Sequence, residues 1–138
     1  HGRDRETLEA LRGGWLHTGD VAWMDEEGYL YIVDRKKDMI ISGGENIYPR
    51  EIEEVLLSHP SILDAAVVGF RDPLWGESVR AFIVPAADNP LTEEMVVEHC
   101  RRHLASYKKP KVVSFVKEIP RNPSGKILKT KLRETAVV

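Results

Sequence analysis

Hydrophobic and polar positions follow two different patterns along this chain, and the change falls near residue 39. The first part holds short β-forming runs between turns, such as Tyr29 to Val33 after the polar turn at 25–28. From residue 39 onward, stretches with the helical spacing of apolar residues alternate with short apolar runs. The pattern therefore predicts β-hairpins first and then a unit that mixes helices with strands.

Three helices are predicted in the second part. The first begins at Pro49, because proline suits the first helical position. Its apolar stripe has the i, i+3, i+4 spacing and consists of Ile52, Val55 and Leu56. Thr92 is expected to cap the second helix, and the third spans residues 127–134.

Strands are expected at four places in this part: residues 39–41, 63–69, 79–84 and 112–116. The resulting order is β, α, β, β, α, β, α. It indicates an α+β fold in which about three helices pack on one face of a small mixed sheet. Residues 1–36 hold hairpins with no helix to bury them. We interpret them as the trailing segment of a larger domain, and residues 37–138 as a second domain.

The composition is that of an ordinary globular protein, with 42% apolar and 30% charged residues. A net charge of −2 provides no general attraction to nucleic acid or to an anionic membrane, and no apolar run is long enough to span a bilayer. We therefore expect neither partner. The single cysteine, Cys100, has no partner for an internal disulfide, which predicts a cytoplasmic protein.

His99 and His103 lie four residues apart, a spacing that can place two metal ligands on one helix face. The pattern supplies no acidic third ligand on that face. We therefore expect no metal site, with Cys100 in the core and the two histidines on its flank.

The clearest chemical signal is Lys126, which ends the polar turn 121–126. Pro123 fixes its own φ and Gly125 allows a positive φ, so the chain bends sharply here. The stretch is not a phosphate-binding P-loop, because the upstream glycine is absent and Ile127 follows the lysine. A single ammonium on such a loop suits an anionic group that changes charge during a reaction. The alternative is a lysine that only decorates a surface turn.

Four further polar points lie beside glycines or strand ends. Asp20 can accept hydrogen bonds from a sugar diol, or else form an Asx turn. The Arg35 guanidinium can donate two hydrogen bonds to phosphate or ribose oxygens; alternatively, Arg35 is a solvated residue at the end of a strand. The charged stretch 36–38 is either a linker or a pivot between two states. The turn 42–44 offers bare backbone to a narrow ligand, or is a plain turn.

Three segments match, in order, motifs that occur together in one enzyme superfamily. They are GWLHTGD at 14–20, YLYIVDRKKD with the following SGGENIYPREIE between 29 and 53, and PRNPSGK at 120–126. The chain resembles the C-terminal end of the AMP-forming acyl-CoA synthetases, the superfamily that also includes luciferases and the adenylation domains of peptide synthetases. The resemblance covers nearly the whole chain from Gly13 onward.

The resemblance implies roles for three residues on the nucleotide side. Asp20 would hold the ribose hydroxyls of ATP and of the acyl-adenylate, and Arg35 would contact the nucleotide. Lys126 would be the catalytic lysine of adenylation, bridging the carboxylate substrate and the α-phosphate. A lysine acetyltransferase acting on Lys126 would remove this charge and silence the enzyme.

The resemblance also implies a hinge and a coenzyme A site. Lys37 matches the family's hinge, about which the C-terminal domain rotates between two half-reactions. Gly43 and Gly44 would line the pantetheine tunnel of coenzyme A, with Glu45 beside them. One position departs from the family: Ile41 is apolar where some relatives have a basic residue that touches the nucleotide.

We therefore expect the C-terminal portion of an acyl-CoA ligase, which converts a fatty or medium-chain acid, ATP and coenzyme A into acyl-CoA, AMP and diphosphate. Residues 1–36 would end a large N-terminal domain, which is the partner of residues 37–138. This N-terminal domain would bind Mg²⁺ together with ATP. That domain also holds the phosphate loop and the acyl pocket, so this chain alone should be inactive. The alternatives are an amino-acid adenylation domain that loads a carrier protein, and a non-catalytic docking or dimerisation module.

Overall fold

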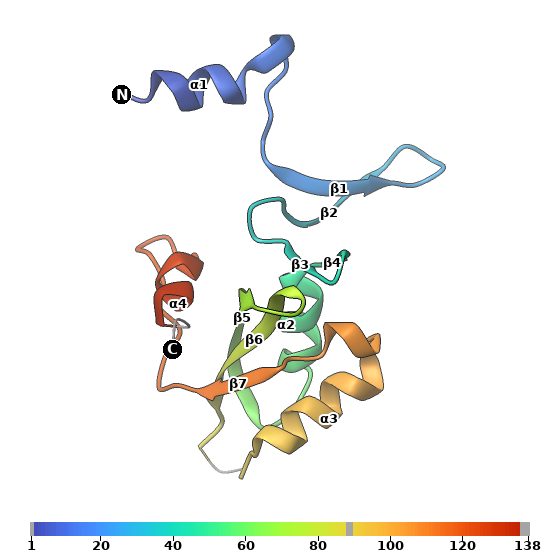
Figure 1. Ribbon diagram of the computed structural model, residues 1–138, viewed down its shortest axis with the longest axis vertical. Coiled ribbons are helices and arrows are strands. Elements are labelled where there is room, and N and C mark those ends of the chain that lie inside the picture. Colours follow the sequence, from blue (N-terminus) through green and yellow to red (C-terminus); the bar gives the residue numbers. More distant parts are fainter. Residues whose placement is uncertain (1, 88–89, 136–138) are drawn as a thin grey trace. The chain divides into compact units, whose positions relative to one another are not determined.

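The computed structural model of the protein describes residues 2–87 and 90–135. The chain divides into two compact units, His1–Lys37 and Asp38–Val138 (Figure 1). Within the described residues, every helix is too short or too polar to cross a bilayer.

The first unit consists of a short helix and a β-hairpin. Its elements are α1 (Asp4–Ala10), the 3₁₀ turn η1 (Arg12–Gly14), β1 (Asp20–Met24) and β2 (Leu30–Arg35). β1 and β2 pair antiparallel. The carboxylate of Asp25 closes the turn between them, because it accepts hydrogen bonds from the Tyr29 N–H and the Tyr31 hydroxyl, both at 2.9 Å. The hairpin turn predicted at 25–28 is therefore confirmed.

The second unit is a five-stranded sheet with helices on both sides. Its elements are β3 (Ile40–Ser42), β4 (Glu45–Ile47), α2 (Pro49–Leu57), β5 (Ile62–Asp72), β6 (Gly76–Pro85), α3 (Glu93–His103), the 3₁₀ turn η2 (Ser106–Lys108), β7 (Val112–Phe115) and α4 (Lys129–Thr135). The strand order is β4-β3-β6-β5, and β7 lies parallel to β6 while the other pairs are antiparallel. This mixed sheet confirms the predicted α+β fold class.

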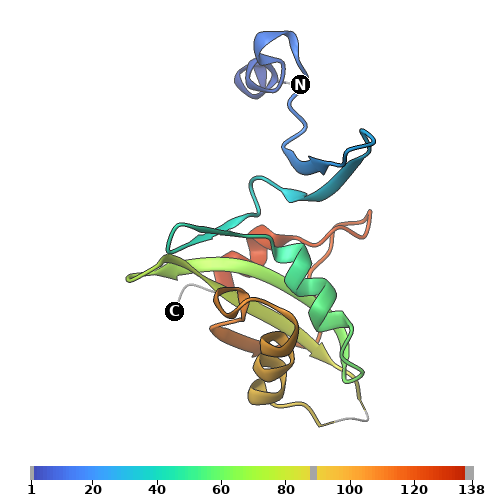
Figure 2. The same ribbon diagram turned by 90° about the vertical axis from the view of Figure 1, so that its right-hand side faces the viewer.

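The long hairpin of β5 and β6 is buried on both faces. Alternate residues of a strand point to opposite faces. Val67 therefore packs in the core under α2 and α3, whereas its neighbour Val68 packs with Leu132 of α4. Figures 1 and 2 show α2 and α3 on one side of the sheet and α4 on the other. The prediction that the helices cover one face is wrong; the near-continuous apolar run of β5 is typical of a strand buried on both faces.

The starts of two helices agree with the prediction. Pro49 is the first residue of α2, and the Thr92 hydroxyl accepts a hydrogen bond from the Met95 N–H at 3.3 Å. Other boundaries differ from the prediction. β5 and β6 continue past the predicted strands 63–69 and 79–84 into a tight turn at 73–75, and β4 is not predicted. Pairing with neighbouring strands extends these elements beyond what local composition indicates.

Leu56 and Leu57 provide a matched test of this core. Leu56 is fully buried beneath α2, whereas its neighbour Leu57 is 48% exposed. Leu56→Ala should lower the free energy of unfolding by about 2–5 kcal/mol, because it removes packed methyl groups and leaves a cavity. Leu57→Ala should lower it by less than about 1 kcal/mol. Urea denaturation measures both changes, and equal losses would contradict the assignment of the two faces of α2.

Candidate functional site

Asp20 and Arg35 face each other across the paired ends of β1 and β2. The Arg35 Nε lies 3.1 Å from the Asp20 Oδ1, and the side chains are 43% and 25% exposed respectively. Gly19, which precedes Asp20, has a φ of +77°, so the chain turns sharply into the strand. The hairpin thus brings together two of the three residues proposed from sequence for nucleotide binding, and the Arg35 guanidinium orients the Asp20 carboxylate.

A polar hollow of about 420 Å³ lies beside this pair within the first unit. Its lining residues come from α1, from the segment between α1 and β1, from the first residue of β1 and from the residue after β2: Glu9, Arg12, Leu16, His17, Thr18, Gly19, Asp20 and Lys36. The Lys36 N–H donates to the Gly19 carbonyl at 2.8 Å, which fixes one wall. The hollow presents charged side chains and the Thr18 hydroxyl to a polar ligand.

Lys37 and Asp38 mark the boundary between the two compact units. Lys37 is the last residue of the first unit and its side chain is exposed; Asp38 begins the second. Asp20, Arg35 and Lys37 therefore belong to the first unit, whereas Gly43, Gly44, Glu45 and Lys126 belong to the second.

Gly43 and Gly44 form the two-residue turn between β3 and β4. Their φ values are +59° and +88°, the combination that a tight hairpin turn with two left-handed residues requires. Trp75 packs directly on Gly43: a Cβ added there would lie 2.8 Å from the indole ring. The Gly43 N–H also donates to the Trp75 carbonyl at 2.9 Å. Both backbone conformation and close approach therefore require glycine at position 43.

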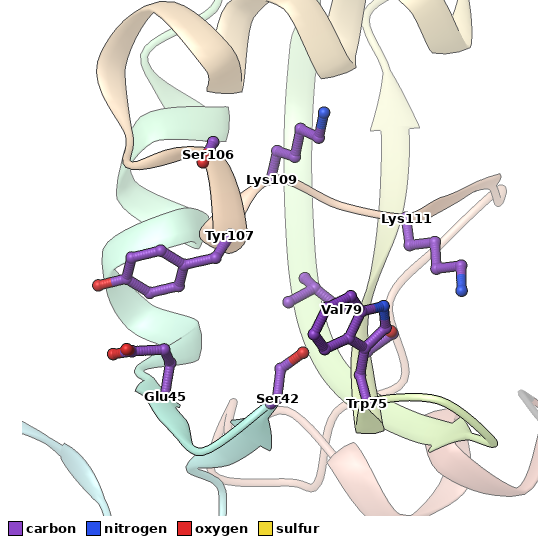
Figure 3. Close-up of a pocket in the computed structure, with 10 residues that line it drawn as sticks. Ser42, Glu45, Trp75, Val79, Ser106, Tyr107, Lys109 and Lys111 are labelled. Atoms are coloured by element: carbon purple, nitrogen blue, oxygen red, sulfur yellow. The ribbon is translucent and has the colours of Figure 1, made fainter.

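A groove of about 390 Å³ opens beside this turn (Figure 3). Its lining residues come from three segments distant in sequence: Ser42, Gly43, Glu45, Trp75, Ser78, Val79, Ser106, Tyr107, Lys109 and Lys111. Figure 3 shows Tyr107 and Glu45 on one side, Trp75 on the other and Ser42 between them. Trp75 and Tyr107 are 52% and 45% exposed, so two aromatic rings face solvent here. A narrow apolar chain with a charged end suits such a groove.

The two lysines of the groove differ in their electrostatic surroundings. The Lys111 Nζ lies 2.6 Å from the Oδ2 of the buried Asp72, which also accepts a hydrogen bond from the Ser78 hydroxyl. The ammonium of Lys111, together with Ser78 and nearby backbone N–H groups, holds the pKa of Asp72 well below its usual range. Lys109 has no ion pair within the part of the chain that the structure describes. Lys109 is therefore the uncompensated cation of the groove.

Lys126 lies on a loop that is closed by its own hydrogen bonds. The Asn122 Oδ1 accepts from the backbone N–H of Ser124 at 3.1 Å and of Lys126 at 2.8 Å. Arg121 donates to both carboxylate oxygens of Asp64 on β5 and to the Gly125 carbonyl, each at 2.9 Å. The Lys126 side chain is exposed, and among residues 2–87 and 90–135 its ammonium has no hydrogen bond or ion pair. The loop therefore exposes this charge to solvent, while the hydrogen bonds of Asn122 and Arg121 hold its backbone in place.

The glycine turn and the Lys126 loop lie at opposite ends of the sheet. The loop is tied to Asp64 near the start of β5, whereas the turn adjoins Gly76, which pairs with Ser42 and with Asp72, the last residue of β5. Asp64 and Asp72 are eight positions apart on β5, which corresponds to about 26 Å of extended strand. Figure 2 shows the teal β3–β4 turn and the red loop before α4 on opposite sides of the domain.

Cys100 and the nearby histidines take part in the packing of α3 against α2 and the core. Cys100 is fully buried, as expected, and burial raises the pKa of its thiol to about 11. The His99 Nε2 lies 2.8 Å from the Val55 carbonyl, so this ring joins α3 to α2. The rings of His59 and His103 lie 4.9 and 4.6 Å from that of His99. Over the described ranges, no group of three or more His, Cys, Asp or Glu side chains is placed to hold a metal ion.

Seven lining residues of the groove are not identified from the sequence: Trp75, Ser78, Val79, Ser106, Tyr107, Lys109 and Lys111. A partial signal was present, because Trp75 is an aromatic residue beside a glycine in a turn, and the two lysines belong to a basic stretch at 108–111. Their convergence depends on the sheet, since β3, the β5–β6 turn and the segment after α3 meet only in three dimensions.

Comparison with known proteins places these features in a family. Residues 51–126 match the family model described as the AMP-binding enzyme C-terminal domain. The chain is 54% identical over 132 residues to a 2-succinylbenzoate–CoA ligase of Bacillus mycoides, a match that covers 96% of this chain and 27% of that protein.

Two solved structures are similar to the chain in sequence and in fold. A fatty acyl CoA synthetase of Mycobacterium tuberculosis is 53% identical with a TM-score of 0.75, over 96% of this chain and 26% of that one. An o-succinylbenzoate CoA synthetase of Bacillus subtilis, in complex with an acyl-adenylate intermediate, is 42% identical with a TM-score of 0.89, over 96% and 27%. The chain thus spans about a quarter of the length of these relatives. The resemblance seen in the motifs is confirmed, and the chain belongs to the AMP-binding enzyme C-terminal domain family.

Proposed function

We propose that this chain is the C-terminal portion of an ATP-dependent ligase that joins a carboxylic acid to coenzyme A through an acyl-adenylate. One observation carries the proposal: a single domain presents, at one end of its sheet, an exposed ammonium with no ion pair among the described residues, and at the other end a glycine-lined groove. These features suit two successive reactions, the first on a phosphate and the second with a thiol on a long, narrow arm.

The first half-reaction is adenylate formation. An oxygen of the acid attacks the α-phosphorus of ATP, diphosphate leaves, and negative charge gathers between two anions. The Lys126 ammonium is the group that would stabilise this charge, because no carboxylate on its own loop neutralises it. Asp20, oriented by Arg35, would accept hydrogen bonds from the ribose hydroxyls.

The first unit would complete a larger N-terminal domain. Several of its large apolar side chains are exposed, as expected for a surface that packs against further protein; they include Trp15, Leu16, Trp23, Met24 and Leu30. That domain would hold Mg²⁺, the adenine ring and the acid. We infer a cytoplasmic location for the enzyme, where ATP and coenzyme A are available and the free Cys100 stays reduced.

In the full-length protein that contains this chain, Lys126→Ala should slow adenylate formation by about two to three decades, equivalent to ~3–4 kcal/mol of transition-state stabilisation. It should leave thioester formation from a pre-made acyl-adenylate nearly unchanged, because no phosphorus is attacked in that step. Single-turnover release of diphosphate and of AMP measures the two steps separately. Lys131→Ala is the matched control, an exposed lysine of the neighbouring helix α4.

The same pair of assays tests two alternatives. A docking or dimerisation module would lose neither step on replacement of Lys126. Acetylation of Lys126 by a lysine acetyltransferase would reproduce the selective loss, since it removes the same charge. Acetylated enzyme that forms adenylate at the normal rate would contradict this regulatory hypothesis.

The second half-reaction is thioester formation, for which the groove of Figure 3 supplies the binding surface. The pantetheine arm of coenzyme A would lie along Gly43 and Gly44, where side chains are absent, with Glu45 beside it. Because the Lys126 loop and this turn lie at opposite ends of the sheet, the two would reach one reaction centre in turn by rotation of the domain. Lys37 is the proposed hinge, and the boundary between the compact units after Lys37 supports this assignment.

Lys109 should bind a phosphate of coenzyme A, since Lys111 is already neutralised by Asp72. In the full-length protein, Lys109→Ala should raise the KM for coenzyme A about tenfold through loss of a charge-assisted contact, and leave adenylate formation unchanged. Steady-state kinetics at varied coenzyme A measures the change. Lys117→Ala, at an exposed lysine outside the groove, is the control. An unchanged KM in the Lys109 variant would contradict the placement of coenzyme A.

The names of the relatives suggest two candidates for the carboxylic acid substrate. The sequence predicts a fatty or medium-chain acid, and one solved relative is a fatty acyl CoA synthetase at 53% identity. A curated relative of similar identity, 54%, is named for 2-succinylbenzoate. We take 2-succinylbenzoate as the first candidate and a medium-chain fatty acid as the second.

The full-length protein should release AMP from ATP when given coenzyme A and one of these two acids. The rate with the preferred acid should exceed that with the other by at least about tenfold, because an acid pocket in the N-terminal domain would discriminate between their shapes. Replacing coenzyme A by a phosphopantetheine-bearing carrier protein tests the amino-acid adenylation alternative. Turnover with the carrier and an amino acid, but not with free coenzyme A, would overturn the ligase proposal.

A further inference from the structure

The N-terminal end of α4 is fixed by an ion pair that passes around the edge of the sheet. The Lys129 Nζ lies 2.8 Å from the Glu53 Oε1, and the two side chains are only 13% and 14% exposed. Glu53 belongs to α2, on the opposite face of the sheet from α4 (Figure 1). Lys129 is the first residue of α4 and follows Lys126 by three positions, so this pair anchors the C-terminal side of the Lys126 loop.

The same carboxylate oxygen has a second partner on the edge strand. The Glu53 Oε1 accepts a hydrogen bond at 2.8 Å from the N–H of Val67 on β5, a strand whose only neighbour in the described sheet is β6. Glu53 thus satisfies an edge N–H that the sheet leaves open and joins α2, β5 and α4 at one atom. A nearly buried group with two partners defines the position of the helix more closely than an exposed pair does.

A second ion pair lies one helical turn further along α4. The Arg133 Nη2 lies 3.0 Å from the Oδ1 of Asp38, the residue that directly follows Lys37. Lys129 and Arg133 are four residues apart and therefore share a face of α4, while Leu132 anchors the helix in the apolar layer beneath it. α4 is consequently held at one point beside the Lys126 loop and at another beside the proposed hinge.

From this geometry we infer that two ion pairs, Glu53–Lys129 and Asp38–Arg133, position Lys126. Through α4 they keep the Lys126 loop in a fixed position relative to the segment that follows Lys37. The inference rests on the proposed function. Lys126 has no hydrogen bond from its side chain within the described residues, so its placement depends on the base of its loop. Misplacement of a catalytic group by about 1 Å can cost a hundredfold in rate.

The simpler interpretation is that these ion pairs only stabilise the domain. The two interpretations differ in which reaction step suffers. A loss of stability lowers the amount of folded enzyme and affects both half-reactions equally. A loss of positioning affects adenylate formation alone, because only that step uses Lys126.

The decisive variant is the full-length enzyme with Glu53→Gln and Lys129→Met. The glutamine keeps an oxygen to accept the Val67 N–H, and no uncompensated buried charge remains, so the protein should fold. Adenylate formation should fall about 10- to 100-fold, with thioester formation from pre-made acyl-adenylate within about twofold of normal. Asp38→Asn should show the same selective loss to a smaller degree, because the asparagine retains an acceptor for Arg133. Lys129→Arg, which keeps the ion pair, should retain most of the first step.

The matched control is Glu51→Gln with Lys108→Met. This pair also starts on α2 and has a 2.7 Å ion pair with partly buried side chains, but it ties α2 to η2 and not to α4. The control should form adenylate at a rate within about twofold of normal. Amide hydrogen exchange should quicken at residues 121–128 in the Glu53/Lys129 variant and remain normal there in the control.

The results separate the inference from the proposed function. If Lys126→Ala loses adenylate formation but the Glu53/Lys129 variant does not, the inference is overturned and the proposed function stands. Equal loss of both steps in the Glu53/Lys129 variant, or faster exchange throughout the domain, also overturns the inference. If Lys126→Ala itself keeps adenylate formation, the proposed function fails first.

Discussion

The burial of the β5–β6 hairpin on both faces is the constraint on which the rest of the second unit depends. Its alternating side chains form two separate apolar layers, one under α2 and α3 and one under α4. Because both layers must be covered, α4 lies on the face away from the other helices, and the chain that leads to it crosses the sheet. The Lys126 loop lies on that crossing segment, so its position follows from the demand to bury Val68 and Phe82 as much as from its own sequence.

The same hairpin separates the two chemical features of the domain. One end of β5 anchors the loop through Asp64, and the turn beyond its other end brings Trp75 onto Gly43. A stiff two-stranded ribbon keeps these features at a constant separation, so one cannot approach the other by local bending. A sequence of two reactions at one centre would then require the whole domain to turn, as the proposed hinge at Lys37 allows.

Tertiary contacts determine which lysines are neutralised within the domain and which remain available to bind an anionic ligand, as four lysines illustrate. Lys111 and Lys129 are paired with the carboxylates of Asp72 and Glu53, which are buried or nearly so. Lys109 and Lys126 have no ion pair among the described residues. An ammonium that is already neutralised attracts a further anion weakly, whereas a free one at a groove or loop keeps its full charge for a ligand. The two unpaired lysines are the ones assigned to phosphate in the proposed reactions.

The sequence by itself determined the features that depend on neighbouring residues. Pro49 starts α2, the two glycines at 43 and 44 make the turn, and Asn122, Pro123 and Gly125 shape the loop that carries Lys126. The motifs around these residues were sufficient to identify the family. Only the tertiary structure decided on which face α4 lies, which groove lysine is paired with a carboxylate, and that Glu53 meets Lys129 around the edge of β5. These outcomes depend on strand register and on the packing of segments far apart in the chain, which local spacing and turn chemistry do not specify.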